Sequence, residues 1–369
     1  MRLIIGLMSG TSIDAIDAAL CRFDGGTWQG VIATHSQPYP AELRDQLIES
    51  QLSPDLPRPL RHWLHLDEQV AHHFAGAANA LLKSAQVERT RVEAIGSHGQ
   101  TVFHEPRRLG SSWQLGNPNR IAALTGITTV ADFRRADIAH GGEGAPLVPA
   151  FHQALFASPD EARCVLNIGG IANLSVFDPG VAKGKGFDVG PGNALMDAWC
   201  QHAAQRDYDE AGAWARSGTL DTDLLGALLA EPYFGQPPPK STGRDHFNLA
   251  WLRSHAPHVD QLNPADVQRT LCELSAITIS AAISMHAPAA RKVLVCGGGA
   301  YNRFLMSLLA RRLPHVSVEY TEAYGLDGRW VEAAAFAWLA SCTLDGRPGN
   351  LPSATGADRP VILGGIYRA

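Results

Sequence analysis

The sequence LIIGLMSGTS, at residues 3–12, is an apolar strand that runs directly into a glycine-rich turn, and the same pattern returns at VLNIGGIAN (165–173) and VLVCGGGAYN (293–302). Glycine in such a turn lets backbone N–H groups approach a bound anion closely. One turn of this kind would be weak evidence, because glycine serves tight turns more often than ligands. Three of them predict a single nucleotide held from several sides.

The segment after each turn distinguishes these sites from the common nucleotide-binding motifs. The first two turns lead into IDAIDAALCRF (13–23) and ANLSVF (172–177), short proline-free segments that predict β-hairpins. The third turn opens a helix, since apolar residues recur with helical spacing between Phe304 and Leu313. No segment matches the dinucleotide-binding G-x-G-x-x-G turn before a helix, or the P-loop. Two similar hairpins, one in each half of the chain, indicate a duplicated unit.

Composition limits the class of protein. The 369 residues suffice for about two domains with buried cores. A net charge of −5, without any run of Lys or Arg, argues against a nucleic-acid-binding protein. The six cysteines are scattered, without a C-x-x-C pair, and are expected to be reduced core residues. Because the sequence shows no signal-peptide pattern and no apolar run near the ~18 residues of a membrane span, a cytoplasmic location without membrane attachment is expected.

Strands and helices alternate along the chain, which favours an α/β architecture. Asn263 and Pro264 are suited to the N-cap and the first position of a long helix that ends before residues 286–288. The other expected elements are helices over 41–52 and 61–85, one strand over 92–106, exposed loops over 236–240 and 346–360, and a final strand over 361–367.

Seven motifs along the chain are together similar to those of one protein family. They are GLMSGTSIDAIDAAL (6–20), SHGQTVFHEP (97–106), ADFRRADIAHGGEGAPLVPAFHQALF (131–156), VLNIGGIANLS (165–175), GFDVGPGNALMDAW (186–199), KSTGRDHFN (240–248) and VCGGGAYN (295–302). In this order they resemble the anhydro-N-acetylmuramic acid kinases, which belong to the superfamily of sugar kinases, actin and heat-shock chaperones. The resemblance runs from residue 6 to the C-terminus.

The resemblance implies an α/β fold of two ribonuclease-H-like (actin-like ATPase) domains with mixed sheets around a central cleft. Domain I is expected to comprise residues 1–130 and 345–369, and domain II residues 131–344. The resemblance also implies a cytoplasmic enzyme that uses ATP with magnesium and acts on a small-molecule amino sugar during peptidoglycan recycling. Family members commonly pair, so a homodimer is implied as well.

The reaction that the resemblance implies is both a hydrolysis and a phosphorylation. The substrate is a 1,6-anhydro sugar, whose O6 is bonded to its own anomeric carbon. Water attacks C1 while the released O6 takes the γ-phosphoryl group of ATP, which gives N-acetylmuramate 6-phosphate and ADP. Such chemistry requires a carboxylate that takes the proton of the water, groups that hold the phosphates, and donors that orient the sugar.

Two carboxylates match the family's catalytic positions. Asp188, within GFDVGPGN, corresponds to the catalytic aspartate and is expected to be the base. Without the resemblance, an aspartate that caps the next helix would be the simpler interpretation. Glu332 corresponds to a glutamate near the sugar and the attacking water. Its alternative role is to complement the dipole in the first turn of the helix expected at 330–340.

The phosphate end of the site is assigned to the glycine turns. The resemblance places the nucleotide against Gly10, Thr11, Ser12, Ile13, Asp14, Ala15, Ile16, Asp17, Gly169, Gly170, Gly297, Gly298 and Gly299. Asp14 is expected to hold magnesium, directly or through water, or else to be an ordinary aspartate at a strand edge. Ala15 stands where the family motif has a glycine, a change expected to tighten the backbone without abolishing the site.

The sugar end is assigned to His98, Gln100, Asp132, Arg134 and Pro146. Alternation along one strand would place His98 and Gln100 on a common face, where they meet sugar hydroxyls, although a histidine bonded to backbone is the commoner case. Arg134 is expected to bind the lactyl carboxylate of muramate, with an Asp–Arg ion pair as an equally good account. Pro146 is expected to line the pocket as rigid backbone.

Two other classes of protein share a nucleotide site of this kind. One is an actin-like-fold kinase or phosphatase for another small molecule, and the other is a nucleotide-driven interaction protein. The latter needs neither the SHGQT segment nor the GFD-x-GPGN base. Lys240 and Arg244 are placed to reach ATP phosphates or close a lid, but a lone basic pair means little. The histidines of HWLHLDEQVAHHF (62–74) lack metal-binding spacing and predict a polar helix face.

Overall fold

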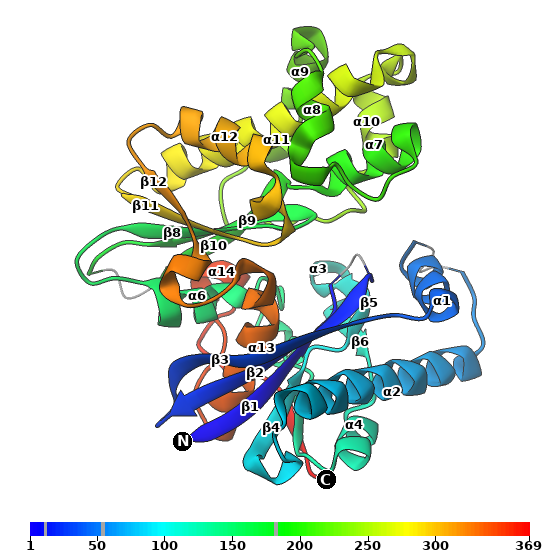
Figure 1. Ribbon diagram of the computed structural model, residues 1–369, viewed down its shortest axis with the longest axis vertical. Helices are drawn as coiled ribbons and strands as arrows, with labels where there is room; N and C mark the ends of the chain where they lie inside the picture. The colour runs from blue at the N-terminus through cyan, green and yellow to red at the C-terminus, as the bar shows by residue number, and fades with distance from the viewer. Residues whose placement is uncertain (11–12, 53–55, 181–183) are drawn as a thin grey trace. The chain divides into compact units, whose positions relative to one another are not determined.

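The computed structural model describes residues 1–10, 13–52, 56–180 and 184–369, which form two compact units (Figure 1). Unit 1 comprises Met1–Phe151 and Trp330–Ala369, and unit 2 comprises His152–Arg329. In these described ranges, no helix combines the length and the apolar character that a bilayer crossing needs. All six cysteines are buried, as expected for core residues, and the described residues form no disulfide.

Unit 1 is built on a six-stranded mixed sheet in the order β13-β7-β4-β1-β2-β3. β1 and β2 form the antiparallel hairpin that was predicted around the first glycine turn, and β4 and β7 run parallel to β1. The elements of unit 1 are β1 (Arg2–Met8), β2 (Ala15–Asp24), β3 (Thr27–Pro38), α1 (Ala41–Leu52), α2 (Leu60–Ala85), β4 (Val92–Ser97), β5 (Gln100–Glu105), α3 (Pro106–Leu109), β6 (Ser111–Leu115), α4 (Pro118–Thr125), β7 (Thr129–Ala131), α5 (Arg135–Ala139), α6 (Val148–Phe156, which ends in unit 2), α13 (Val331–Leu344), α14 (Pro352–Thr355) and β13 (Gly365–Tyr367).

Helices cover both faces of this sheet. Because side chains alternate along β1, Ile5 and Leu7 join the core beneath α2, whereas Gly6 faces α13. A Cβ atom at Gly6 would overlap the carbonyl oxygen of Ala333, and one at Gly96 of β4 would overlap that of Phe336. The two glycines therefore allow the α13 backbone to lie directly on the sheet.

The contact of α13 with β1 and β4 explains why the compact units differ from the expected domain bounds. Residues 131–151 and 330–344 were expected in the second domain, whereas both segments belong to unit 1. Residues 330–344 carry α13, which is fitted to the sheet of unit 1 through Gly6 and Gly96. Ala131, the last residue of β7, pairs with Ser97 of β4 in the same sheet.

The single strand expected over 92–106 is wrong, because the segment forms two strands in different sheets. β4 ends at Ser97, and β5 pairs with β6 in a separate two-stranded sheet. Gly99, between them, has a left-handed φ of +73° that ends the extended run. His98 and Gln100 are consequently buried, while His104 is exposed and does not share their face. The final strand is also shorter than expected, since β13 spans Gly365–Tyr367.

Unit 2 is built on a five-stranded sheet in the order β10-β9-β8-β11-β12. β8 pairs antiparallel with β9 as the second predicted hairpin, and parallel with β11, which leads through the third glycine turn into α12 as predicted. The elements of unit 2 are β8 (Arg163–Ile168), β9 (Ile171–Phe177), β10 (Lys185–Pro191), α7 (Ala194–Ala204), α8 (Ala213–Ser217), α9 (Thr222–Leu229), α10 (Leu249–His255), α11 (Pro264–His286), β11 (Lys292–Cys296), α12 (Arg303–Arg312) and β12 (Ser317–Tyr320).

The two large sheets confirm the predicted duplication. In each, the first strand pairs antiparallel with its hairpin partner on one side and parallel with a later strand on the other, so that β3-β2-β1-β4-β7 repeats as β10-β9-β8-β11-β12. The chain thus has the α/β fold of two ribonuclease-H-like units with mixed sheets. α11 begins where predicted, since the Asn263 side chain accepts from the N–H of Ala265.

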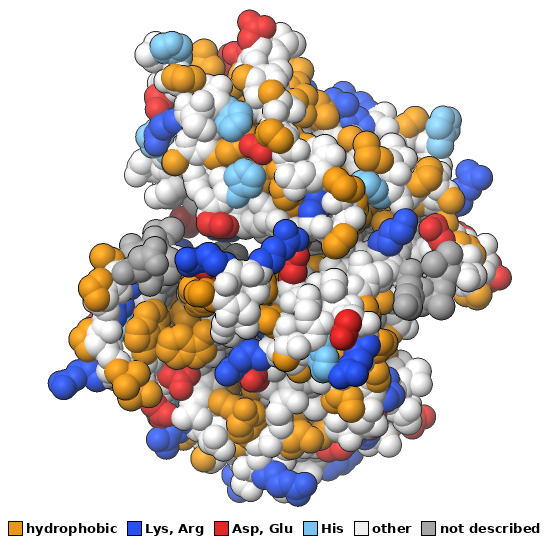
Figure 2. Space-filling view, turned by 180° about the vertical axis from the view of Figure 1, so that it is seen from behind, with side chains coloured by type: hydrophobic (Ala, Val, Ile, Leu, Met, Phe, Trp, Pro, Cys, Tyr) orange, Lys and Arg blue, Asp and Glu red, His pale blue; other side chains and the backbone are white. Residues whose placement is uncertain are grey.

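Lys and Arg side chains do not gather into one basic stripe on the face drawn in Figure 2. There they lie among Asp and Glu side chains and apolar areas. This distribution agrees with the net charge of −5.

The close approach of α13 predicts a strong effect of one methyl group. Gly96→Ala should lower the free energy of unfolding by about 2–3 kcal/mol, because the new Cβ displaces the backbone of α13. Gly226→Ala in α9 is the matched control, since its Cβ meets no atom and a helical alanine should raise stability by about 0.5–1 kcal/mol. Urea denaturation of both variants measures the difference, and equal stability of the two would contradict the packing described.

A buried histidine of unit 2 predicts a pH dependence of stability. His152 in α6 is fully buried beside Ser175, with its Nδ1 3.0 Å from the Ser175 Oγ, and burial lowers its pKa from 6.5 to about 3. At a pH between these two pKa values, the unfolded chain binds one more proton than the folded protein, so the free energy of unfolding falls as the pH falls. From pH 7 to pH 5 this histidine should lower the free energy of unfolding by about 2 kcal/mol.

The measurement is the change in unfolding free energy between pH 7 and pH 5 for the wild type and for His152→Phe. The variant should show the smaller loss, because phenylalanine takes up no proton. Phe156→Leu alters the neighbouring core without removing a titratable group, and should lower stability equally at both pH values. A loss on acidification that is the same in His152→Phe and the wild type would exclude the histidine as its source.

Candidate active site

The carboxyl ends of three parallel strands of unit 1 bring most of the predicted sugar residues to one edge. β1, β4 and β7 run in the same direction, so the segments that come after them lie side by side. The Oγ of Ser9, after β1, donates to the Oε1 of Gln100 at 2.6 Å, and the backbone N–H of His98, after β4, donates to the Leu7 carbonyl at 3.0 Å. The first glycine turn and the SHGQ segment therefore form one structural site.

The side chain of Gln100 forms hydrogen bonds within the protein and supports the first glycine turn. Its side chain is fully buried, and its Nε2 donates to the Gly10 carbonyl at 3.2 Å. Its Oε1 also accepts from the hydroxyl of Tyr39 at 3.3 Å. This placement differs from the expected contact with sugar hydroxyls, and it makes Gln100 a support for the backbone at Gly10.

Arg134 and His98 form a tight buried pair. The Nη2 of Arg134 lies 2.7 Å from the Nε2 of His98, and its Nη1 donates to the Gly144 carbonyl at 2.6 Å. Since a guanidinium can only donate, the His98 Nε2 accepts, and the imidazole is neutral. Burial and then the neighbouring arginine charge hold the pKa of His98 well below its usual value, and burial lowers the pKa of Arg134 to about 10.

The loop that carries Pro146 is anchored by a buried carboxylate. Asp137 accepts at its Oδ2 from the N–H of Gly144 at 2.8 Å, and at its Oδ1 from Asn350 and Thr355, each at 2.7 Å. The carbonyl of the same Gly144 receives Arg134. Asp137 thus fixes the loop that leads to Pro146 and the hydrogen bond that orients Arg134.

Glu332 lies in the first turn of α13, close enough to Arg134 for its charge to favour the protonated guanidinium and partly offset the effect of burial on the arginine pKa. The close packing of α13 on β1 and β4 fixes where this first turn stands relative to the edge of the sheet. Asp132, the other predicted carboxylate here, has a left-handed φ of +63° and pairs with Arg135 at 2.9 Å. The ion pair considered as an alternative role for Arg134 is thus observed at the neighbouring arginine.

The first hairpin turn offers backbone and one carboxylate to a nucleotide. Ile13 and Ile16 are fully buried, so their side chains belong to the core. Asp14 is exposed and pairs with Arg44 at 3.2 Å. Ala15 and Asp17 begin β2, with Asp17 opposite Met8 in the pairing. Thr11 and Ser12, also expected to bind phosphate, lie outside the described residues.

Among the described residues, no group of three or more His, Cys, Asp or Glu side chains is arranged to hold a metal ion. A single exposed carboxylate such as Asp14 fits a different kind of site, in which Mg²⁺ keeps several waters and is bound chiefly by phosphates. The donor set therefore fits a magnesium ion that arrives with a nucleotide.

The second half of the predicted site lies at one edge of the sheet of unit 2. β8, β10 and β11 all run in the same direction, and each ends in a glycine turn. The N–H groups of Gly192 and Asn193 donate to the carbonyls of Gly170 and Gly169 at 2.9 and 2.8 Å. A Cβ at Gly299 would overlap the side chain of Ile168. The turns at 169–170, 190–193 and 297–299 are therefore packed together.

One arginine lies at this edge. A Cβ built at Gly170 would lie 2.7 Å from the Nε and 3.0 Å from the Nη2 of Arg244, so the guanidinium rests against the turn. Arg244 is otherwise exposed. From the sequence this residue was only one of a lone basic pair, and the structure places its charge beside a glycine of the second hairpin.

Asp188 is held on three sides. It lies in β10 at an irregularity of the pairing with β9, before the turn that opens α7. Its N–H donates to the Lys240 carbonyl at 3.1 Å, and its own carbonyl accepts the hydroxyl of Tyr233 at 2.9 Å. The backbone N–H of Thr242 donates to its Oδ2 at 3.1 Å. The carboxylate is thus oriented by a segment more than forty residues further along the chain.

Lys240 brings a buried cation to the same place. Its Nζ donates to the Tyr233 carbonyl at 3.0 Å and lies 4.5 Å from the centre of the Tyr233 ring. Burial lowers the pKa of Lys240, and the charge of Asp188 acts in the opposite direction. Sequence reasoning did not assign Tyr233, Lys240 or Thr242 to Asp188, although KSTGRDHFN was among the motifs that carried the resemblance.

Comparison with known proteins identifies the family. The family model described as anhydro-N-acetylmuramic acid kinase matches residues 2–369. Two curated anhydro-N-acetylmuramic acid kinases, from Xanthomonas campestris pv. campestris strains 8004 and ATCC 33913, are each 50% identical over 370 residues, which cover 100% of this chain and 97% of the relative.

Among solved structures, component A of (R)-2-hydroxyglutaryl-CoA dehydratase from Acidaminococcus fermentans matches 93% of this chain and 100% of that one, at 10% identity and a TM-score of 0.49. So distant a likeness adds nothing to the functional assignment. The family model and the curated relatives span essentially the whole chain, and the chain belongs to the anhydro-N-acetylmuramic acid kinase family.

Proposed function

We propose that this protein is a kinase that opens 1,6-anhydro-N-acetylmuramic acid with water and phosphorylates O6 to give N-acetylmuramate 6-phosphate and ADP. The observation that carries this proposal in the structure is the carboxylate of Asp188, oriented by a backbone N–H at the edge where three glycine turns of unit 2 are packed together. A kinase or phosphatase for another small molecule, or an interaction protein, is not favoured by the family match.

Asp188 is the general base of the proposed reaction. Its carboxylate takes a proton from the attacking water, whose oxygen forms the new bond to C1 as the bond from C1 to O6 breaks. O6 bonds to the γ-phosphorus, and the bond from that phosphorus to the bridging oxygen breaks and releases ADP. The hydrogen bond from Thr242 orients the Oδ2, so that less freedom is lost in the reactive geometry.

The glycine turns are the proposed phosphate-binding groups. Gly10, Gly169, Gly170 and the run 297–299 have no side chain to hinder the approach of a phosphate to the backbone. Arg244, against Gly170, adds a positive charge suited to the transferred phosphoryl group. Asp14 would hold the magnesium ion that binds the phosphates, and that ion would neutralise part of their negative charge.

The sugar-binding groups are proposed to lie in unit 1. The hydrogen bonds of Arg134 to His98 and to the Gly144 carbonyl hold the plane of its guanidinium. The remaining N–H donors of that group are proposed to bind the lactyl carboxylate. Glu332, whose charge favours the protonated Arg134 guanidinium, is assigned to the sugar and the attacking water. The cytoplasmic location and the homodimer implied by the resemblance stay predictions, which fractionation and light scattering can test.

The proposed function is tested by incubation of the protein with ATP, Mg²⁺ and 1,6-anhydro-N-acetylmuramic acid in ¹⁸O-labelled water. Mass spectrometry should find a 6-phosphosugar with ¹⁸O at C1. Asp188→Asn should fold normally and bind ATP but lose turnover by roughly 10³-fold or more, because it removes the base. Near-normal turnover of this variant would exclude Asp188 as base, and absence of any phosphosugar with the wild type would exclude the function.

The role of Arg134 is tested with a substrate that lacks its proposed partner. The wild type should prefer 1,6-anhydro-N-acetylmuramic acid over 1,6-anhydro-N-acetylglucosamine, which has no lactyl carboxylate, by about 10- to 100-fold in kcat/KM. Arg134→Gln should lose most of that preference, because the ion pair is absent with both sugars. Arg135→Gln, at the neighbouring exposed arginine, is the control and should retain it. An unchanged preference in Arg134→Gln would refute the assignment.

A further inference from the structure

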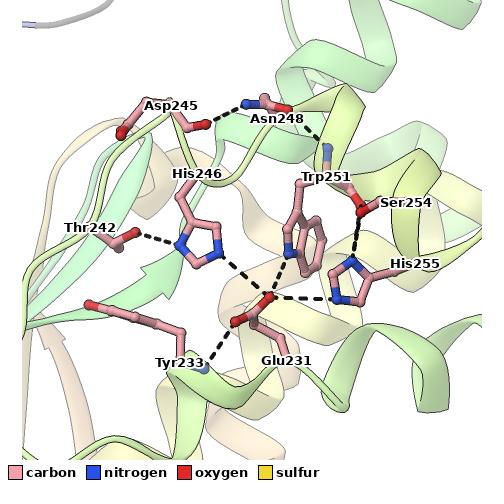
Figure 3. A network of polar contacts seen from close by, with 9 residues as sticks. All are labelled: Glu231, Tyr233, Thr242, Asp245, His246, Asn248, Trp251, Ser254 and His255. Carbon is pink, nitrogen blue, oxygen red and sulfur yellow. Dashed lines mark hydrogen bonds and ion pairs between the residues drawn. The ribbon is translucent and has the colours of Figure 1, made fainter.

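Glu231 is the centre of a polar cluster in unit 2 that lies outside the residues assigned to the proposed reaction (Figure 3). Its carboxylate accepts from the backbone N–H of Tyr233 at 3.0 Å and from the indole Nε1 of Trp251 at 2.7 Å. Its Oε2 also lies 3.5 Å from the Nε2 of His246 and 3.5 Å from the Nε2 of His255. Only 10% of the Glu231 side chain is exposed, so a carboxylate here requires these partners.

Two chains of polar contacts, called the first and second arms below, connect Glu231 to Asp188. In the first, the Nδ1 of His246 lies 3.2 Å from the Oγ1 of Thr242 (Figure 3). The backbone N–H of Thr242 in turn donates to the Asp188 Oδ2 at 3.1 Å. In the second, Tyr233, held at its N–H by Glu231, donates its hydroxyl to the Asp188 carbonyl at 2.9 Å. One buried carboxylate therefore supports Thr242 and Tyr233, two of the residues that contact Asp188.

The chemistry of the first arm sets the direction of its hydrogen bonds. Burial opposes ionisation of Glu231, but the indole and backbone N–H groups and the two histidines hold its pKa below the usual value. An ionised Glu231 favours a hydrogen on the His246 Nε2, the ring nitrogen that faces it. The Nδ1 of the same ring is hydrogen-bonded to the Thr242 hydroxyl, which fixes the residue whose N–H faces Asp188.

We propose that Glu231 and His246 are positioning residues that act through Thr242 to hold the Asp188 carboxylate in its reactive orientation. This inference rests on the proposed function, in which Asp188 is the base. It assigns a task to the KSTGRDHF segment, which joins Thr242, against the base, to Arg244, against the Gly170 turn.

His255 provides a matched control within the same cluster. Its Nε2 contacts the same Glu231 oxygen at the same 3.5 Å, and its ring packs against Trp251 with centroids 4.5 Å apart. Its Nδ1, however, faces the Trp251 carbonyl and Ser254, at 3.0 and 3.2 Å, and not Thr242. A purely structural role for the cluster would make the two histidines equivalent, whereas a positioning role requires His246 alone.

The experiment compares kcat, KM for both substrates and urea stability in His246→Gln, Thr242→Val, Thr242→Ser and His255→Gln. His246→Gln and Thr242→Val should lower kcat about 10- to 100-fold with KM within about threefold, since a displaced base loses reactive geometry and not affinity. Thr242→Ser, which keeps the hydroxyl, should restore most of the rate. His255→Gln should keep its kcat within about threefold. The double variant His246→Gln/Thr242→Val should be no slower than either single one.

Equal losses of kcat in His246→Gln and His255→Gln would overturn the inference, and so would additive losses in the double variant. Asp188→Asn separates the positioning role from the proposed function. If Asp188→Asn is inactive while His246→Gln turns over normally, the positioning role fails and the proposed function stands. If Asp188→Asn turns over normally, the base assignment fails, and the positioning role fails with it.

Discussion

The approach of one helix backbone to two strands is the constraint on which unit 1 depends. At Gly6 and Gly96, any side chain would occupy the space of the α13 carbonyls, so the helix and the sheet meet through backbone atoms. The alanine-rich sequence of α13 suits this contact, because small side chains let a helix lie close to a sheet. The distance and register of α13 then determine where its first turn, with Glu332, stands relative to the carboxyl ends of β1 and β4.

In unit 2, the close backbone contacts are made by loops at the edge of the sheet. Gly192 and Gly299 lie against the backbone and side chain of residues at the end of β8, and the N–H groups after β10 bond to the carbonyls of the second hairpin turn. Three turns that are far apart in sequence are thereby joined at one sheet edge. In both units the parallel strands supply the shared edge, and glycine allows close contact between the turns at the ends of those strands.

Local features of the fold could be predicted from the sequence because local patterns determine them. The two hairpins arise from short apolar runs around a turn, and α11 from the Asn263–Pro264 start. The break between β4 and β5 could not be predicted, since alternation continues through it and only the left-handed φ of Gly99 ends the strand. The membership of α13 in unit 1 depends on space at Gly6 and Gly96, which no pattern within residues 330–344 reveals.

The candidate site likewise contains residues that the sequence could predict and residues that only the structure reveals. Asp188 and Arg134 stand within distinctive motifs, whereas Glu231 has an ordinary neighbourhood in sequence and gains its meaning only from contacts with distant residues. Gln100 shows the reverse case, because a residue within a distinctive motif proves to be a fully buried support for the backbone at Gly10.

The pair of Arg134 and His98 has a consequence for proton exchange in unit 1. A guanidinium that donates to the imidazole Nε2 obliges the ring to carry its one hydrogen on the Nδ1. Such a ring neither releases nor takes up a proton in the neutral range, so it acts as a fixed dipole. Changes of protonation at this edge therefore fall to carboxylates, and a histidine that looks like an acid or base in the sequence serves instead to keep a positive charge in place.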